Sequence, residues 1–341
     1  MENMLLSIKG LNTELAFVDS YIDEFLRTGQ DTGEVAKVLT SARKGRGKMI
    51  RPLLLLLAAR FGPHYPERKQ RLCKLGALVE IVHMASLIHD DIVDDSPQRR
   101  ARPTIQQQFG KDMAVFAGDF MISRVLQRLS KERLSREGLS IAYTIEEMCR
   151  GELGQMSCRW DTKTTVDAYL RNIHGKTVTL FVEAMHLGAD NSDTGEHLTN
   201  CLTAIGEHIG YMFQMRDDLL DFISDEGQEG KPVHQDFAEG IYTLPVLYAL
   251  AQPAYGPRLR EIAAIESSVP NYRTLLTEMR ELVRCSGGME FCQRQIDNHA
   301  IQSRRQIAAL PAQEARTCIS WLIEQLLEYE NNNRLQIAIL K

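Results

Sequence analysis

Two aspartate-rich stretches are the residues whose type and spacing point most directly to chemistry. One reads His89-Asp90-Asp91-Ile92-Val93-Asp94-Asp95 and the other reads Arg216-Asp217-Asp218-Leu219-Leu220-Asp221. Each follows an apolar segment with helical spacing, so the first and last aspartates of each DDxxD lie on one face of a helix. Such carboxylates repel one another unless a cation binds them, and hard oxygen ligands suit Mg²⁺. The sequence therefore predicts two metal-binding helix ends.

Cations near these stretches suggest what the metal would accompany. Mg²⁺ is usually held by one or two protein carboxylates together with phosphate and water, so two facing clusters would grip a diphosphate. Lys48 and Arg51 are expected in a loop before a helix, and Arg99 and Arg100 follow the first cluster. Arginine binds phosphate oxygens in pairs, and lysine acts as a point charge. A solvated helix end is the alternative for a single DDxxD, and the second copy argues against it.

Long segments with apolar residues every three or four positions must carry these side chains. The clearest span residues 77–88, 197–215 and 317–330. Glycine and proline cluster between such segments, and alternating patterns long enough for a sheet are missing from the sequence. We therefore predict an all-α fold, with helices 70–95 and 197–222, apolar on more than one face, at the centre of a bundle. Residues 1–341 are expected to form a single domain.

Composition narrows the classes of protein. Of 341 residues, 44% are hydrophobic and 25% charged, which is typical of a globular protein. A formal charge of −5 gives no general attraction to nucleic acid or anionic membranes. Seven scattered cysteines, none spaced as CxxC, argue against zinc and disulfides and favour reduced thiols in a cytoplasmic protein. We expect no signal peptide and no transmembrane segment, since the longest apolar run, Leu53–Ala59, is far too short.

Further short motifs accompany the aspartates in a fixed order. They are Gly47–Pro52, His83–Asp95, Arg99-Arg100, Gly118-Asp119, Gly151–Gln155, Lys176-Thr177, Phe213–Asp221, Gly230-Lys231-Pro232 and Gly240–Pro245. This ordered set resembles the trans-isoprenyl diphosphate synthases, also called the polyprenyl synthetase family, through nearly the whole chain. The resemblance implies a helical bundle of the isoprenoid synthase type around a deep central cavity, with both aspartate motifs at its mouth, usually in a homodimer.

The resemblance also implies a prenyltransferase that condenses isopentenyl diphosphate head-to-tail with an allylic diphosphate, with up to three Mg²⁺ ions. The implied metal ligands are Asp90, Asp91, Asp94, Asp217 and Asp221. The implied catalytic residues are Asp90, Asp91, Asp94, Arg99, Lys176, Asp217, Asp218 and Asp221. The implied allylic-substrate contacts are Arg99, Lys176, Thr177, Gln214 and Lys231, and those of isopentenyl diphosphate are Lys48, Arg51, His83 and Arg100. Core packing for His83, and backbone pairing for Thr177 and Gln214, remain the alternatives.

Product length should depend on the residues below the reacting carbon. Ala85 and Ser86 lie about one helical turn before Asp90, where a growing chain would pass. Family members limited to short products tend to carry bulky rings there. The small residues predict a long-chain all-trans product of about thirty to forty carbons, unless opposite helices close the cavity. A farnesyl or geranylgeranyl diphosphate synthase is the alternative. Cavity walls must be dry, and Phe181 and Phe213 are candidates that serve equally well as core residues.

Three positions depart from the family pattern. Arg46 and His234 stand at usual glycines, and Ile241 stands at a usual lysine. The last change removes a cation near the allylic diphosphate, which would weaken binding by about one to two orders of magnitude unless Arg216 or Arg46 replaces it. Two further roles stay open: the large subunit of a synthase that needs a small partner, and a non-catalytic diphosphate-binding subunit. A terpene cyclase would not need the cations for a second diphosphate.

Overall fold

Helices form nearly all of the regular structure, because long apolar repeats alternate with short breakers. The computed structural model describes residues 8–27, 33–44, 47–100, 102–223 and 235–327. In chain order the elements are α2 (Leu11–Leu26), α3 (Glu34–Lys44), α4 (Ile50–Ala59), α5 (Tyr65–Val93), β1 (Gln98–Arg99), β2 (Arg102–Pro103), α6 (Ile105–Phe109), α7 (Lys111–Lys131), α8 (Ser135–Ser157), α9 (Val166–Ile173), the π-helix η1 (His174–Val178), α10 (Thr179–Asp190), α11 (Glu196–Ile223), α12 (Gln235–Ala238), α13 (Leu244–Ala251), α14 (Gly256–Ala263), α15 (Tyr272–Cys285), α16 (Gly288–Ala308) and α17 (Glu314–Leu327).

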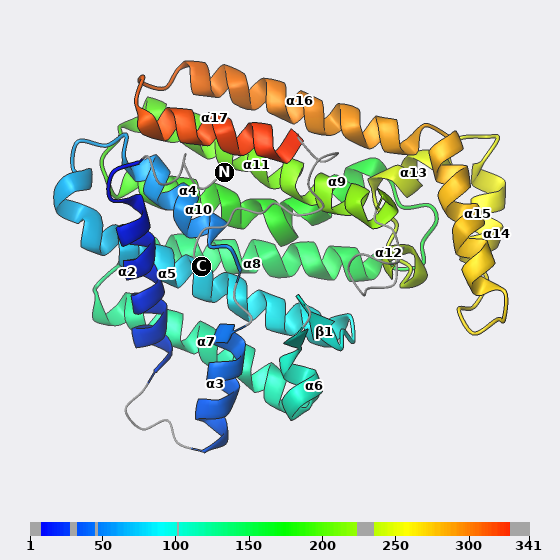
Figure 1. The fold of residues 1–341 in the computed structure, drawn as a ribbon, viewed down its shortest axis with the longest axis horizontal. Helices are drawn as coiled ribbons and strands as arrows, with labels where there is room; N and C mark the ends of the chain where they lie inside the picture. The colour runs from blue at the N-terminus through cyan, green and yellow to red at the C-terminus, as the bar shows by residue number, and fades with distance from the viewer. Residues whose placement is uncertain (1–7, 28–32, 45–46, 101, 224–234, 328–341) are drawn as a thin grey trace.

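The two helices that carry the aspartate motifs lie inside the bundle. Residues 78–82 of α5 are each at most 2% exposed, so no face of this part of the helix reaches solvent. Helix α5 packs on α2, α4 and α7, whereas α11 packs on α10 and α16 (Figure 1). The predicted all-α fold and its central helices are confirmed.

Helix α5 is also the one described helix with the length and apolar composition of a membrane span. Of its most apolar window, 72% is buried inside the protein. Its position in the core accounts for its apolar composition, because interior positions favour such side chains.

The chain after α5 folds back on itself beside the first motif. Asp95 adopts a left-handed conformation (φ 48°), and the Ser96-Pro97 step that follows disfavours helical backbone. Strands β1 and β2 then pair antiparallel, with Arg99 opposite Arg102. This short hairpin is the one departure from helices among the described elements, and two residues per strand are too few for a detectable alternating pattern.

The start of α4 differs from the prediction. The helix begins at Ile50, so Arg51 lies in its first turn and only Lys48 remains in the preceding loop. Pro52 is compatible with this early start, because an N–H in the first turn has no partner within the helix. Arg51 is therefore held on a rigid element.

Candidate active site

The first aspartate motif ends α5 and shares a lysine with a neighbouring helix. Asp90 and Asp94 are both partly exposed. Burial raises the pKa of Asp90 to about 6, an effect that Lys176 opposes and Glu152 reinforces. Burial also raises the pKa of Asp94, again opposed by Lys176. The structure therefore brings Asp90, Asp94 and Lys176 together.

Lys176 reaches this position through the π-helix η1, and π-turns occur often at functional sites. Glycines let α8 approach η1 backbone to backbone, since a Cβ on Gly151 would lie 2.2 Å from the Lys176 backbone nitrogen. This approach leaves Lys176 Nζ 2.8 Å from Glu152 Oε2. Burial alone would lower the pKa of Lys176, but the nearby carboxylates, Asp90 first among them, raise it above its usual value. The ammonium group thus stays charged at neutral pH.

Asp91 is placed differently from the other aspartates of its motif. It is buried, and Arg99 Nε donates a hydrogen bond to its Oδ1 at 2.7 Å. Gln106 Nε2 donates to its backbone carbonyl at 2.6 Å. Asp91 therefore ties the β1–β2 hairpin and α6 to the end of α5. Metal binding by Asp91 would compete with Arg99, so we expect it to position Arg99 instead.

The second motif also buries its middle aspartate. Asp217 is exposed and Asp221 partly exposed, whereas Asp218 is buried in α11. The Tyr169 hydroxyl donates to Asp218 Oδ2 at 2.5 Å, and Gln214 Nε2 donates to Oδ1 at 2.9 Å. Burial raises the pKa of Asp218 to about 7, although both hydrogen bonds lower it. The carboxyl group of Asp218 is thus committed to an internal network.

Thr177 and Gln214 belong to the same network. Thr177 Oγ1 donates to Gln214 Oε1 at 2.7 Å, so η1 and α11 are joined by side chains. Their partners are side chains, where the sequence had left substrate contact or backbone pairing open. Because Thr177 follows Lys176 directly, this network also fixes the π-turn that presents the lysine.

Lys176 and Asp236 connect the two motifs. Burial raises the pKa of Asp236, in α12, well above its usual value; Asp221, Asp218 and Asp217 raise it further, and Lys176 lowers it. Lys176 therefore interacts with Asp90 and Asp94 of the first motif and with Asp236, which itself lies close to the aspartates of the second motif, as expected if α5 and α11 end at the same side of the bundle (Figure 1). Lys231 lies outside the described residues.

The carboxylates supply oxygen donors with a surplus of negative charge, which fits Mg²⁺. Among the described residues, no three His, Cys, Asp or Glu side chains converge closely enough to hold an ion unaided. Mg²⁺ usually takes several ligands from water and substrate phosphate, so partly assembled carboxylates are what such a site requires.

A second cluster gathers the cations predicted to bind isopentenyl diphosphate. Burial lowers the pKa of Arg51 to about 10, while Glu80 raises it and Arg100 lowers it. Burial and then the nearby arginines, Arg51 first, hold the pKa of His83 well below its usual value, so His83 is neutral at pH 7. Arg51, His83 and Arg100 are thus neighbours, and Lys48 is exposed in the adjoining loop.

Aromatic rings lie directly beside this cation cluster. The Arg51 guanidinium carbon is 4.4 Å from the Phe181 ring centroid, and the Phe181 and Phe213 centroids are 5.4 Å apart. On α5, Ala85 is fully buried, and the partly exposed Ser86 donates from Oγ to the His83 carbonyl at 2.9 Å. Small side chains therefore stand at both predicted length-determining positions.

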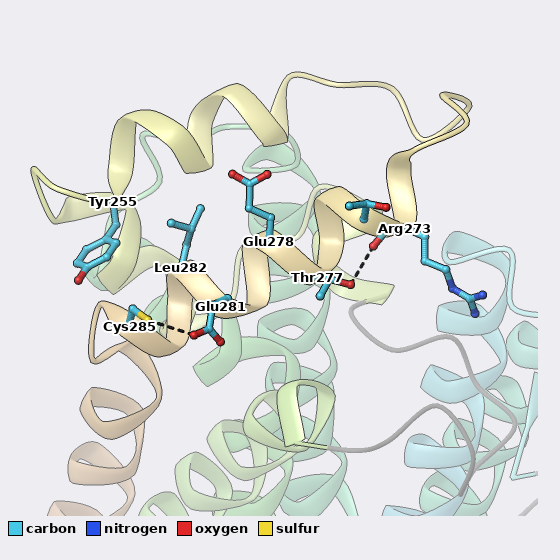
Figure 2. A pocket seen from close by; sticks show the side chains of 8 residues that line it. Tyr255, Arg273, Thr277, Glu278, Glu281, Leu282 and Cys285 are labelled. Carbon is cyan, nitrogen blue, oxygen red and sulfur yellow. Dashed lines mark hydrogen bonds between the residues drawn. The ribbon is translucent and has the colours of Figure 1, made fainter.

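One cavity lies beside this site, and one groove lies away from it. A cavity of about 570 Å³ between α3, α5 and α6 is lined in part by Met84, Asp91 and Arg99. A groove of about 750 Å³ runs along α15 and contains none of the predicted site residues (Figure 2). Its charges are paired internally, for example Glu278 with Arg258 Nε at 2.7 Å.

Several residues at the site escaped prediction. They are Glu152, Arg159, Tyr169, Asp236 and Glu239. Glu152 and Asp236 stand inside or beside quoted motifs, so their positions carried a signal that was not used. Tyr169 has no such signal, because its partner Asp218 is 49 positions away in sequence.

Comparison with known proteins places the chain in a family. The helical fold and paired carboxylate motifs are those of an all-α prenyltransferase, and the sequence model named polyprenyl synthetase matches residues 33–279. The chain is 35% identical over 268 residues to heptaprenyl diphosphate synthase component 2 of Geobacillus stearothermophilus, which covers 76% of this chain and 82% of that relative. The chain belongs to the polyprenyl synthetase family.

Two further similarities cover more of the chain. The nonaprenyl diphosphate synthase of Mycobacterium tuberculosis is 29% identical, over 91% of this chain and 90% of its own length. A crystal structure of polyprenyl synthase from Caulobacter crescentus, complexed with calcium and isoprenyl diphosphate, superposes with a TM-score of 0.82 at 26% identity and covers 92% of this chain and 94% of that one. The predicted family and enzyme class are thus confirmed.

Proposed function

We propose that this chain condenses isopentenyl diphosphate with an allylic diphosphate, head to tail, to make a long-chain all-trans polyprenyl diphosphate. The observation that carries the proposal is Lys176, whose ammonium group interacts with Asp90 and Asp94 of the first motif and with Asp236, which adjoins the second motif. Asp90 and Asp94 on one side, and Asp217 and Asp221 on the other, would hold up to three Mg²⁺ ions. When bound, Mg²⁺ supplies neutralisation of the charge on the departing diphosphate.

The chain's own residues divide the two diphosphates between two cation clusters. Lys176 and Arg99 would hold the allylic diphosphate beside the carboxylates, whereas Arg51 and Arg100 would orient isopentenyl diphosphate. A neutral His83 donates or accepts a hydrogen bond there without adding charge. The Phe181 and Phe213 rings next to Arg51 would exclude water from the allylic cation.

A product assay tests the reaction. Purified chain is incubated with Mg²⁺, labelled isopentenyl diphosphate and farnesyl or geranylgeranyl diphosphate, and chain length is read after dephosphorylation. We expect products of about thirty to forty carbons, since the small residues Ala85 and Ser86 lie about one helical turn before Asp90. Diphosphate binding without product would contradict a self-sufficient synthase.

The length-determining positions can be tested on one helix. Ser86→Phe should shorten the product by several five-carbon units, because a ring would fill space next to the cation cluster. Ser86 is preferred to Ala85 for this test, because a ring in place of a fully buried alanine risks overpacking. Gln70→Phe is the matched control, since Gln70 is exposed near the other end of the same helix. Equal product lengths in Ser86→Phe and the parent enzyme would refute the assignment.

We infer that a second protein chain covers α7 and α8. Large apolar side chains on these helices are exposed: Phe116 69%, Leu139 59%, Tyr143 60% and Leu153 66%. Exposed apolar clusters of this kind mark protein interfaces. A homodimer is the first candidate. A small-subunit partner is the second, because two relatives are each component 2 of a heptaprenyl diphosphate synthase. The mass of the purified chain in solution, compared between the parent and Leu139→Ser, distinguishes them.

We propose that the protein is located in the cytoplasm. All seven cysteines lie in the described residues and are free thiols, which suits the reducing cytoplasm. Fractionation of cells producing the full chain tests this assignment.

A further inference from the structure

Arg159 lies between the two walls of the proposed site. Its Nη2 is 3.5 Å from Asp94 Oδ1, in the first motif, and 3.3 Å from Glu239 Oε2, just after α12. Charge-assisted hydrogen bonds in tight pairs are about 2.7–2.9 Å long. The guanidinium is thus shared loosely between two carboxylates, and both contacts run through one of its nitrogen atoms. Such a cation can turn to a stronger anion without losing a tight partner.

The turn that carries Arg159 is fixed against the chain before Ile241. The Trp160 N–H donates to the Gly240 carbonyl at 2.8 Å, and Trp160 takes a left-handed conformation (φ 63°). A Cβ on Gly240 would lie 2.3 Å from the Trp160 ring, so the indole packs directly on this glycine. Residues 159–160 and 239–240 therefore pack directly against one another. Arg159 is held at the same turn in which Ile241 replaces the usual lysine.

The other suggested replacements fit less well. Arg216 is buried in α11 at 6% exposure, and burial lowers its pKa. Arg46 lies outside the described residues. Arg159, by contrast, has a 27% exposed side chain and already contacts Asp94.

We propose that Arg159 binds the allylic diphosphate in place of the lysine missing at Ile241. The inference rests on the proposed function. A diphosphate entering between Asp94 and Glu239 offers paired oxygen atoms to a guanidinium fork, which is a better match than either single carboxylate at its present distance. Because neither present contact is tight, Arg159 gives up little when it binds a diphosphate instead.

The test measures binding as well as turnover. Binding of inorganic pyrophosphate with Mg²⁺ is measured by calorimetry for the full-length protein and for Arg159→Met. The variant should bind about 10- to 100-fold more weakly, since one charged hydrogen-bonding group is removed. The KM for the allylic diphosphate should rise, while the KM for isopentenyl diphosphate stays unchanged. A purely structural defect would raise both.

Rescue from a different element makes the test specific. Ile241→Lys, added to Arg159→Met, should restore most of the pyrophosphate affinity, and Arg159→Lys should retain part of it. Arg136→Met, which changes an exposed arginine at the opposite end of α8, is the matched control and should bind as the parent does. Unchanged binding in Arg159→Met, or failure of Ile241→Lys to restore it, overturns the inference. If the parent protein itself neither binds pyrophosphate nor forms product, it is the proposed function that fails.

Discussion

The two aspartate motifs look alike in sequence but differ in the charges around them. In the first motif, Asp90 and Asp94 share Lys176, and Asp94 also contacts Arg159. Around the second motif, burial raises the pKa of Asp236, the carboxylates of Asp221, Asp218 and Asp217 raise it further, and Lys176 lowers it. The first motif is therefore partly neutralised by the fold. The second places three carboxylates close to a buried fourth, Asp236, so we expect it to contribute more to metal dependence.

Removing one outer carboxylate from either motif should cause the largest loss of activity. Asp90→Asn and Asp221→Asn should each lower kcat/KM by about a thousandfold or more, because charge on the leaving diphosphate loses its counter-charge. Steady-state assays at saturating Mg²⁺ check this result. Asp297→Asn, which changes an exposed aspartate on α16 outside all the site motifs, is the control and should retain activity. Near-normal turnover in either motif variant would remove that motif from the active site.

Glu183 is a buried carboxylate outside the active site, so it shows the effect of burial on stability without any effect on catalysis. Glu183 in α10 accepts a hydrogen bond from Ser140 Oγ at 2.8 Å, and burial raises its pKa to about 7. Its pKa is higher in the folded state than in the unfolded state. The stability it contributes is therefore present below pH about 4.5 and lost as pH rises through about 7.

Glu183→Gln should remove this pH dependence without changing catalysis. At pH 8 the variant should unfold with a free energy about 2 kcal/mol higher than the parent, and at pH 4 the two should be equal. Urea denaturation at both pH values measures the difference. A variant that is less stable than the parent at pH 8 would show that the ionised carboxylate is stabilising.

The middle aspartates provide a finer test, because each is held by a different kind of partner. Tyr169→Phe removes the hydroxyl that donates to Asp218 and leaves a buried carboxyl oxygen without that donor. We expect about a tenfold loss of kcat and a loss of about 1–3 kcal/mol in stability, since Asp218 also holds Gln214 and the π-turn. Tyr143→Phe, on an exposed tyrosine, is the matched control. Identical kinetics in both variants would deny Asp218 a positioning role.

Sequence periodicity was enough to predict α5 and α11, because burial on several faces leaves a long unbroken apolar pattern. The aspartate motifs and the cation cluster of Arg51, His83 and Arg100 were also found, since each has neighbours close in sequence or a family motif. The π-turn that presents Lys176 was not predictable, because it depends on backbone contact between α8 and η1. Arg159 and Tyr169 were missed for the same reason: their partners come from distant segments.

The smallest expected effect is the most direct measure of the difference between the motifs. Without metal, Asp221→Asn should raise the free energy of unfolding by about 1 kcal/mol, because it relieves repulsion with Asp236. Asp94→Asn should change it by less, because the lost attraction to Lys176 and Arg159 offsets the relief of the burial that raises the Asp94 pKa. Thermal unfolding in chelator, repeated with Mg²⁺ and pyrophosphate, measures both changes. Ligand-induced stabilisation should fall in both variants, so only the metal-free values carry the contrast. If both substitutions change the metal-free free energy of unfolding by the same amount, the difference in surrounding charge between the two motifs has no energetic consequence.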